Sequence, residues 1–256
     1  MNASPTLREW LAEQPFTLTM SSGFFGFFAH TGLLTTLEDA SLLPRSASGS
    51  SAGALVSGLW AAGLDAVSLR DELLRLRRED FWDPTPGFGL LRGELFRSRL
   101  ESLVQQKRFD ECRIPVTVSI FDVWTRTTRT ITAGHVAPAV QASCTVPFLF
   151  HPRWIEGRPS LDGGILDRPG LQGVPAGERV FFHHLASRSP WRRRRGTSMQ
   201  IPARANMTAL VIENLPRVGP FRLPNGAIAF ERARRASRVA LDRPVRESLA
   251  RLSALE

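Results

Sequence analysis

The sequence predicts an α/β domain with a mostly parallel central sheet. Over the first 62 residues, strand-like and helix-like segments alternate in the order strand, helix, strand, sharp turn and helix, which is how parallel sheets are built. The chain has 256 residues, of which 43% are hydrophobic, and this is enough to bury one sizeable core. No internal repeat or long low-complexity linker divides residues 1–256, so we expect a single domain.

The first elements come in that order. Residues 16–21 alternate between apolar and polar, which predicts a strand. After a glycine turn, apolar residues at helical spacing predict a helix over residues 27–40. Residues 45–48 predict a short strand, residues 49–53 a sharp turn, and the small apolar residues 54–64 a helix that can pack closely on a sheet.

The middle of the chain predicts helices at residues 65–79, 94–106 and 137–144. Two β runs within residues 114–133 predict a hairpin, and residues 81–93, rich in proline, glycine and aromatic residues, predict an ordered loop.

The later part predicts a short strand that ends at Asp162 and two further strands at residues 179–185 and 207–214. We expect an exposed loop at residues 187–198. From Ile228 onward we expect a basic helical end, so residues 186–256 should combine a strand with helices.

The formal net charge is +9, and nearly all the positive charge is arginine, because Lys107 is the only lysine. Arginine binds phosphate through a two-pronged fork, so this balance favours anionic partners: nucleic acid, acidic proteins or an anionic lipid surface. An arginine-rich host proteome is the alternative explanation. No recognisable nucleic-acid-binding motif accompanies the charge, so we do not expect a nucleic-acid partner.

Cys112 and Cys144 lack the spacing of metal or redox pairs, so we expect two small buried hydrophobes, no metal and no organic cofactor. The first residues lack the basic and apolar segments of a signal peptide, and no window is long and apolar enough to span a bilayer. We therefore expect a cytoplasmic protein that is soluble or bound peripherally at the inner membrane surface.

Residues 49–53 match the pattern G-x-S-x-G. A serine on a tight strand-to-helix turn is strained so that its Oγ is exposed, and Gly49 and Gly53 remove Cβ atoms where strand and helix approach each other. The N–H of Ala52, at the start of the following helix, would face the oxyanion of an attacked ester. The pattern predicts Ser51 as a nucleophile, and a plain Gly/Ser turn is the alternative.

A second glycine turn follows the first strand at residues 21–26. Because parallel strands end at the same edge of a sheet, this turn should lie beside Ser51. The backbone N–H groups of Gly23, Phe24 and Phe25 are then candidates for an oxyanion hole. A plain βα turn is the alternative, and a dinucleotide-binding loop does not fit because G-x-G-x-x-G is absent.

A nucleophilic serine needs a base within hydrogen-bond reach. His183 or His184 would follow Ser and Asp in the order of an α/β-hydrolase, which predicts a Ser-Asp-His esterase. Asp162 offers a different base, because Gly163 and Gly164 let the backbone pass close to the site. An Asx-type turn is the alternative for D-G-G, and His30, on the expected first helix, is more typical of a structural role.

Three motifs in order resemble the patatin-like phospholipases. Residues 21–63 combine the glycine turn, an A-H-x-G-x-L run at Ala29–Leu34, and the G-x-S-x-G turn. Residues 142–164 resemble the second block of that family, which runs from A-S through V-P-x-x-F to the D-G-G of the catalytic aspartate. The resemblance covers about residues 16–185.

The resemblance implies a three-layer α/β/α fold and a lipid acyl hydrolase of the phospholipase A type. It implies a dyad of Ser51 and Asp162, 111 residues apart, with no histidine. One departure concerns the oxyanion turn, because the family's G-G-G-x-[K/R]-G is replaced here by S-G-F-F-G without a basic residue. An inactive lipid-binding protein on the same fold is therefore an alternative.

One cluster in the expected exposed loop combines an aromatic residue with charge: Trp191, Arg192, Arg193, Arg194 and Arg195. Tryptophan prefers the membrane interface, and arginines are attracted to anionic lipids. The cluster predicts peripheral contact with an anionic membrane, and a solvated loop is the alternative.

Overall fold

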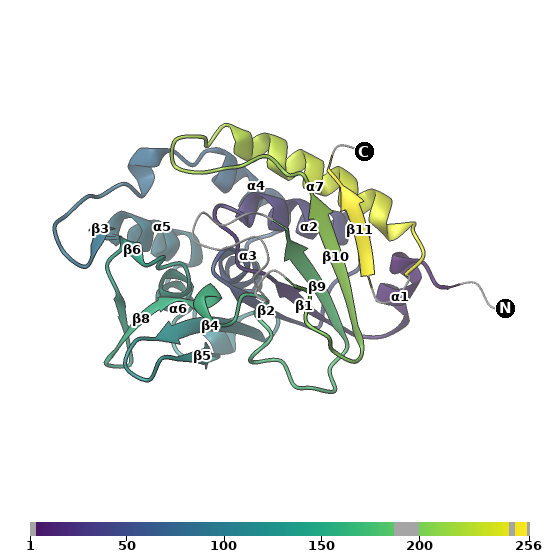
Figure 1. The fold of residues 1–256 in the computed structure, drawn as a ribbon, viewed down its shortest axis with the longest axis horizontal. Helices are drawn as coiled ribbons and strands as arrows, with labels where there is room; N and C mark the ends of the chain where they lie inside the picture. Colours follow the sequence, from purple (N-terminus) through teal and green to yellow (C-terminus); the bar gives the residue numbers. More distant parts are fainter. Residues whose placement is uncertain (1–3, 187–199, 246–248, 255–256) are drawn as a thin grey trace.

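The computed structural model describes residues 4–186, 200–245 and 249–254. Within them, nine strands form one sheet in the order β11-β10-β9-β1-β2-β4-β8-β7, with β5 also paired to β4 (Figure 1). The strands of this sheet are β1 Thr17–Met20, β2 Ser46–Ser50, β4 Val116–Asp122, β5 Thr127–Ile131, β7 Arg153–Ile155, β8 Arg158–Asp162, β9 Val180–Leu185, β10 Met207–Glu213 and β11 Leu249–Ser253.

Helices flank the sheet, and α2, α4 and α7 lie together on one side of it (Figure 1). The α-helices are α1 Leu7–Glu13, α2 Phe27–Asp39, α3 Ala52–Ala61, α4 Ala66–Leu74, α5 Glu94–Val104, α6 Val136–Ser143 and α7 Asn225–Leu241. Short 3-10 turns are η1 Arg78–Asp80, η2 Phe109–Glu111 and η3 Gly163–Ile165, and a separate pair of strands is β3 Gly89–Leu91 with β6 Phe148–Phe150. The predicted α/β class with a mostly parallel sheet is confirmed.

The parallel register of the central strands places apolar residues of neighbouring strands side by side in the core. Leu18 of β1 lies opposite Ala47 of β2, which lies opposite Val116 of β4, and all three are buried in the main core beneath the helices. Small residues let the helices come close. A Cβ on Gly32 of α2 would lie 2.5 Å from the carbonyl oxygen of Phe230 in α7, so glycine sets that helix spacing.

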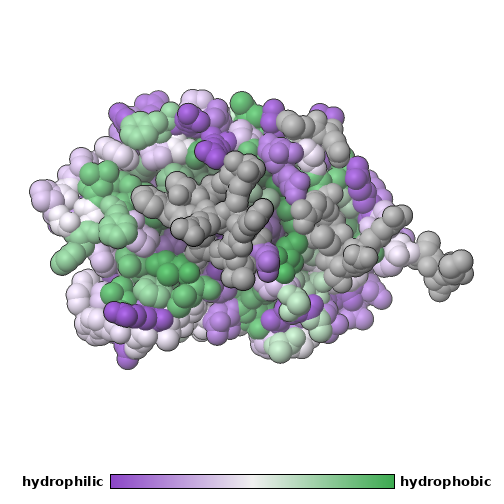
Figure 2. All heavy atoms as spheres, in the orientation of Figure 1, coloured by the Kyte–Doolittle hydropathy of each residue, from purple (hydrophilic) through white to green (hydrophobic). Residues whose placement is uncertain are grey.

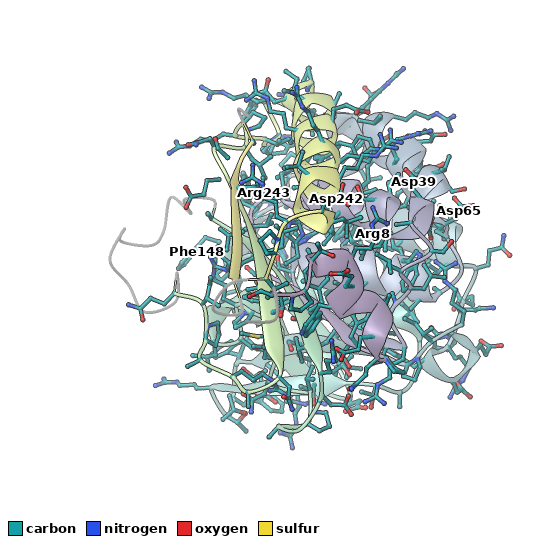
Figure 3. All side chains as sticks on the ribbon, turned by 90° about the vertical axis from the view of Figure 1, so that its right-hand side faces the viewer. Arg8, Asp39, Asp65, Phe148, Asp242 and Arg243 are labelled. Carbon is teal, nitrogen blue, oxygen red and sulfur yellow. The ribbon has the colours of Figure 1, made fainter. Side chains whose placement is uncertain are left out.

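The N-terminal segment contacts the chain just after α7. The N–H of Leu7 in α1 donates to the carbonyl of Arg243, and the guanidinium of Arg8 lies 3.4 Å from the Asp242 carboxylate (Figure 3). Both charged groups are largely exposed, so the ion pair adds little stability and the burial of Leu7 anchors α1. Helix α1 was not predicted from the sequence, although Thr6 and Glu9 form its capping box.

One edge of β4 carries two strands end to end. β5 pairs with residues 118–122 of β4, so β2 and β8, which pair with residues 116–119 and 120–122, share the opposite edge. β2 is parallel to β4 and ends at Ser50 opposite Ser119, whereas β8 is antiparallel and ends at Asp162 opposite Ile120. The last residues of β2 and β8 therefore lie opposite adjacent residues of β4, Ser119 and Ile120.

Two expectations about the fold are wrong. Residues 81–93 are not only a loop, because β3 lies within them and pairs in parallel with β6 through Gly89 and Phe148. The helical end also does not continue, because α7 stops at Leu241 and β11 adds an edge strand beside β10. Both strands depend on partners distant in sequence, which short-range periodicity does not encode.

On the face shown in Figure 2, apolar side chains gather in patches between polar ones. The most exposed large apolar residues of the described chain come from several segments and include Phe88, Phe148 and Phe221. No helix within the described residues combines the length and apolarity needed to cross a bilayer. The expected exposed loop at residues 187–198, with Trp191 and Arg192–Arg195, lies outside the described residues, so its contact with a membrane stays a prediction.

Candidate active site

Ser51 lies on a sharp turn between β2 and α3. Its φ of 53° and ψ of −118° are unfavourable for a residue with a side chain. Such strain persists only where neighbouring contacts enforce it. Ser51 is buried except for 8% of its surface, so the turn presents the hydroxyl to a narrow opening and not to bulk water.

The two glycines of the turn are required by close approach of the backbone. A Cβ on Gly53 would lie 2.0 Å from the carbonyl oxygen of Met20 at the end of β1. A Cβ on Gly49 would lie 2.4 Å from the carbonyl carbon of Gly53. Both distances are far below van der Waals contact, so the start of α3 reaches the sheet edge only because these residues lack side chains.

The hydroxyl of Ser51 donates a hydrogen bond to Oδ2 of Asp162 at 2.7 Å. The second carboxylate oxygen, Oδ1, accepts the N–H of Gly164 at 2.8 Å, which fixes the orientation of the carboxylate. Asp162 is only 7% exposed. The two side chains are close because β2 and β8 end side by side on one edge of β4. Asp162 is the last residue of β8, and Ser51 comes one residue after the end of β2.

Glycines also allow the chain after Asp162 to pack against its neighbours. A Cβ on Gly163 would lie 2.0 Å from the carbonyl oxygen of Ser119 in β4, and a Cβ on Gly164 would lie 2.2 Å from the Oγ of Ser22. The chain after Asp162 thus runs directly against β4 and against the turn that follows β1. The structure brings the three segments predicted from sequence to one place.

Two residues at the end of α6 also contact Ser51. The Oγ of Ser143 accepts the N–H of Ser51 at 2.8 Å, and the Sγ of Cys144 donates to the Ser51 carbonyl at 3.2 Å. Neither contact was predicted from the sequence, and Cys144, expected to be a small buried hydrophobe, uses its thiol as a donor. Burial and the Asp162 carboxylate raise the pKa of this thiol well above its usual value, so it stays protonated.

Ser51 lines an apolar cavity. Ser51, Ala52, Leu55 and Leu59 line it at helical spacing, so it runs along one face of α3 for about two turns, on the order of 12 Å. Apolar side chains from the glycine turn, α4, α5 and the β6 region complete the lining, namely Phe24, Phe25, Phe27, Leu69, Leu73, Leu76, Phe81, Phe96, Leu100, Leu103, Val146, Leu149 and Phe150. Among the charged residues of this lining, Glu72 and Arg99 form an ion pair with each other.

His183 makes no hydrogen bond to Ser51 or Asp162 in the described part of the chain. Its Nδ1 lies 2.8 Å from Nδ1 of His30, and its Nε2 is buried without a partner. Nε2 of His30 donates to the carbonyl of Ser21 at 2.8 Å, since a carbonyl can only accept. His184 is buried as well. Within the described residues, no group of three or more His, Cys, Asp or Glu side chains is arranged to hold a metal ion.

A sequence profile described as patatin-like phospholipase matches residues 18–174, more than half of the chain. The chain belongs to this family. The predicted resemblance is confirmed, and the matched residues include Ser51, Asp162 and the glycine turn. The chain thus contains a patatin-like phospholipase domain, and membership of this family implies a lipid substrate.

Known relatives support the family and the fold. Uncharacterized NTE family proteins from Mycobacterium bovis and Mycobacterium tuberculosis are each 32% identical to the chain over 158 residues, which cover 59% of the chain and 42% of each relative. The chain therefore spans less than half the length of these curated relatives. The crystal structure of VipD from Legionella pneumophila aligns with a TM-score of 0.54 at 15% identity, over 77% of the chain and 50% of VipD.

The glycine turn of this patatin-like domain departs from the family pattern in sequence but keeps free backbone donors. Gly26 N–H bonds to the carbonyl of Gly23 at 2.9 Å and closes the turn. Phe25 occupies the family's basic position with a φ of 54°. The N–H groups of Gly23, Phe24, Phe25 and Ala52 donate to no acceptor within the described residues, and all four residues line the cavity.

The buried histidines of the patatin-like domain predict acid sensitivity. Burial lowers the pKa of His30 to about 4, and burial together with neighbouring His30 and His184 lowers the pKa of His183 well below its usual value. Between pH 6.5 and about 4 the unfolded chain binds more protons than the folded one. The stability that these neutral histidines contribute should therefore be fully present above pH 6.5. The free energy of unfolding should decrease as the pH falls toward 4, by about 3 kcal/mol for His30 alone.

Urea unfolding at pH 7 and pH 4.5 measures this effect. His30→Gln keeps a donor for the Ser21 carbonyl but cannot gain a proton, so its stability should depend less on pH than that of the wild type. His135→Gln, at an exposed position, is the control and should retain the wild-type dependence. An identical pH dependence in His30→Gln and the wild type would contradict the assignment.

Proposed function

We propose that the protein is a serine acyl hydrolase that cleaves fatty-acyl esters of lipids or phospholipids through a dyad of Ser51 and Asp162. The observation that carries this proposal is the 2.7 Å hydrogen bond from the hydroxyl of Ser51, which lines an apolar cavity, to Asp162. Membership of the patatin-like phospholipase family supports a lipid substrate.

In the first half of the reaction, Asp162 takes the hydroxyl proton as the Ser51 Oγ attacks the ester carbonyl carbon. The C–O bond to the leaving alcohol then breaks, and Asp162 returns its proton to that oxygen. In the second half, Asp162 takes a proton from water, the hydroxide oxygen attacks the acyl carbon, and Ser51 Oγ leaves with the proton. The products are an alcohol and a fatty acid, and the enzyme is unchanged.

Negative charge develops on the carbonyl oxygen at each tetrahedral step and needs donors placed in advance. The free N–H groups of Gly23 and Ala52, one from each strand-to-helix turn, are the donors we propose, with Phe24 or Phe25 as the next along the turn. The N-terminal end of α3 adds positive potential at the same place. Because backbone groups act here, a basic side chain in the turn is not required for this role.

The cavity supports a fatty-acyl substrate. Most of its lining residues are leucine or phenylalanine, so an acyl chain that leaves water for this cavity gains about 0.8 kcal/mol for each buried CH₂ group. A short polar acyl group would gain almost nothing. The apolar lining therefore favours long acyl esters over acetyl esters, whereas the lipid head group would stay outside.

Incubation with a fluorophosphonate probe tests the proposal, with Ser51→Ala as the control. We expect one covalent adduct on Ser51, none in the variant, and faster hydrolysis of p-nitrophenyl octanoate than of the acetate. Labelling without lipid or octanoate hydrolysis would favour a short-chain esterase. A folded wild-type protein that neither labels nor hydrolyses would instead favour the lipid-binding alternative, in which the altered glycine turn has lost catalysis.

A further inference from the structure

The end of α6 holds the peptide groups on both sides of the Ser51 Cα. The Oγ of Ser143 accepts from Ser51 N–H at 2.8 Å and donates to the carbonyl of Ser119 at 2.6 Å. Ser143 has no exposed surface, so this hydroxyl replaces solvent as the partner of both backbone groups. On the other side, the Cys144 thiol and Leu55 N–H both donate to the Ser51 carbonyl.

The position of this bridge follows from the topology. The β2–β4 ladder ends at the pair Ser50 and Ser119. At Ser51 the backbone turns to a positive φ, and Asp162 at the end of β8 lies opposite the next residue of β4. The hydroxyl of Ser143 thus joins the N–H of Ser51, on the strand-to-helix turn at residues 49–53 (the elbow), to the carbonyl of Ser119 on β4. The bridge lies just beyond the last residue pair of the β2–β4 ladder.

We propose that Ser143 is a positioning residue whose hydroxyl bridge keeps the strained elbow in place and so keeps the Ser51 Oγ on Asp162. This inference rests on the proposed function, because it concerns the reactivity of Ser51. Without the bridge, a buried donor and a buried acceptor lose their partner, and the elbow gains freedom to relax toward an ordinary φ. That relaxation moves the Oγ away from the carboxylate and from the oxyanion donors.

A matched control is present in the adjacent helix. Ser57 of α3 is also buried, but its hydroxyl has no hydrogen-bond partner within the described residues. Ser57→Ala therefore removes a buried serine hydroxyl near the same core without removing a bridge. Ser143→Ala removes the bridge, and Ser143→Thr restores a hydroxyl at the same position.

The first measurement is the rate of fluorophosphonate labelling together with kcat and KM for a p-nitrophenyl ester. We expect Ser143→Ala to lower the labelling rate and kcat by about 10- to 100-fold, with KM within about threefold of the wild type. Ser143→Thr should recover most of the loss, and Ser57→Ala should match the wild type. Wild-type labelling by folded Ser143→Ala would overturn the proposal. If that variant does not fold, Ser143→Gly, which also removes the hydroxyl, takes its place with the same criterion.

The second measurement does not depend on catalysis. Amide hydrogen exchange at Ser51, followed by NMR, should be at least about tenfold faster in Ser143→Ala than in the wild type or Ser57→Ala, because the N–H has lost its acceptor. Unchanged exchange would overturn the bridge even if the protein had no hydrolase activity. Faster exchange in a protein that never labels would support the bridge and reject the proposed function.

Discussion

Changing Asp162 to Asn is expected to lower kcat/KM for p-nitrophenyl ester hydrolysis by about 10³- to 10⁴-fold, nearly as far as Ser51→Ala. The asparagine side chain has the same shape and can still accept the Gly164 N–H, but its amide cannot take the proton of Ser51. Because the two side chains act as a unit, the double variant should be little worse than either single variant. Steady-state kinetics of the three variants measures this.

Asp167→Asn is the matched control for this experiment. Asp167 is also buried, at 5% exposure, and accepts the Ser119 hydroxyl and the N–H of Leu171. Asparagine keeps only one accepting oxygen, and its NH₂ group then faces the N–H of Leu171 or of Gln172, so we expect some loss of stability. The activity of the folded variant should nevertheless stay within about threefold of the wild type. A folded variant with both His183 and His184 changed to Ala should also retain most activity. An inactive folded histidine variant beside an active Asp162→Asn would establish a Ser-Asp-His triad instead.

Gly53→Ala is expected to destabilise the protein by about 3 kcal/mol and to abolish fluorophosphonate labelling of Ser51. The new Cβ would lie 2.0 Å from the carbonyl oxygen of Met20, and both groups belong to backbone that is fixed in the sheet or in α3. The start of α3 would have to move away from β1, taking Ser51 with it. Urea unfolding and probe labelling of the purified variant measure the two effects.

Gly177→Ala serves as the control, because a Cβ at Gly177 meets no atom within 4 Å. It should leave labelling unchanged and alter stability by at most about 1 kcal/mol, in the stabilising direction if the unfolded chain loses freedom. Should Gly53→Ala prove as stable and as reactive as Gly177→Ala, the close approach of α3 to β1 would be refuted.

The structure agrees with local patterns in the sequence where neighbouring residues decide the outcome. The spacing of apolar residues predicted α2, α3, α5 and α6 to within a few residues at each end. The glycines around Ser51 and Asp162 marked two tight turns, because the absence of a Cβ at a close approach is visible in the sequence. These motifs, taken in order, also indicated the family that the comparison with known proteins shows.

Local sequence patterns could not predict which strands pair with partners that are distant in the chain. β3, β6 and β11 are short, and each depends on a partner distant in the chain. Ser143 lies in the A-S pair that begins the second family block, but that pattern does not indicate which groups its hydroxyl contacts, and only the packing of α6 against β4 places it beside the Ser51 turn.

The sequence by itself determined that Ser51 and Asp162 each lie at a glycine turn that follows a strand, because turn chemistry depends on neighbouring residues. Only the tertiary structure decided that these turns meet with 2.7 Å between the two side chains. The reason is the pairing of β4, whose one edge accepts β2 in a parallel and β8 in an antiparallel direction, so that Ser51 and Asp162, 111 residues apart in the chain, come to adjacent positions. The same pairing leaves the buried N–H of Ser51 to be satisfied by Ser143.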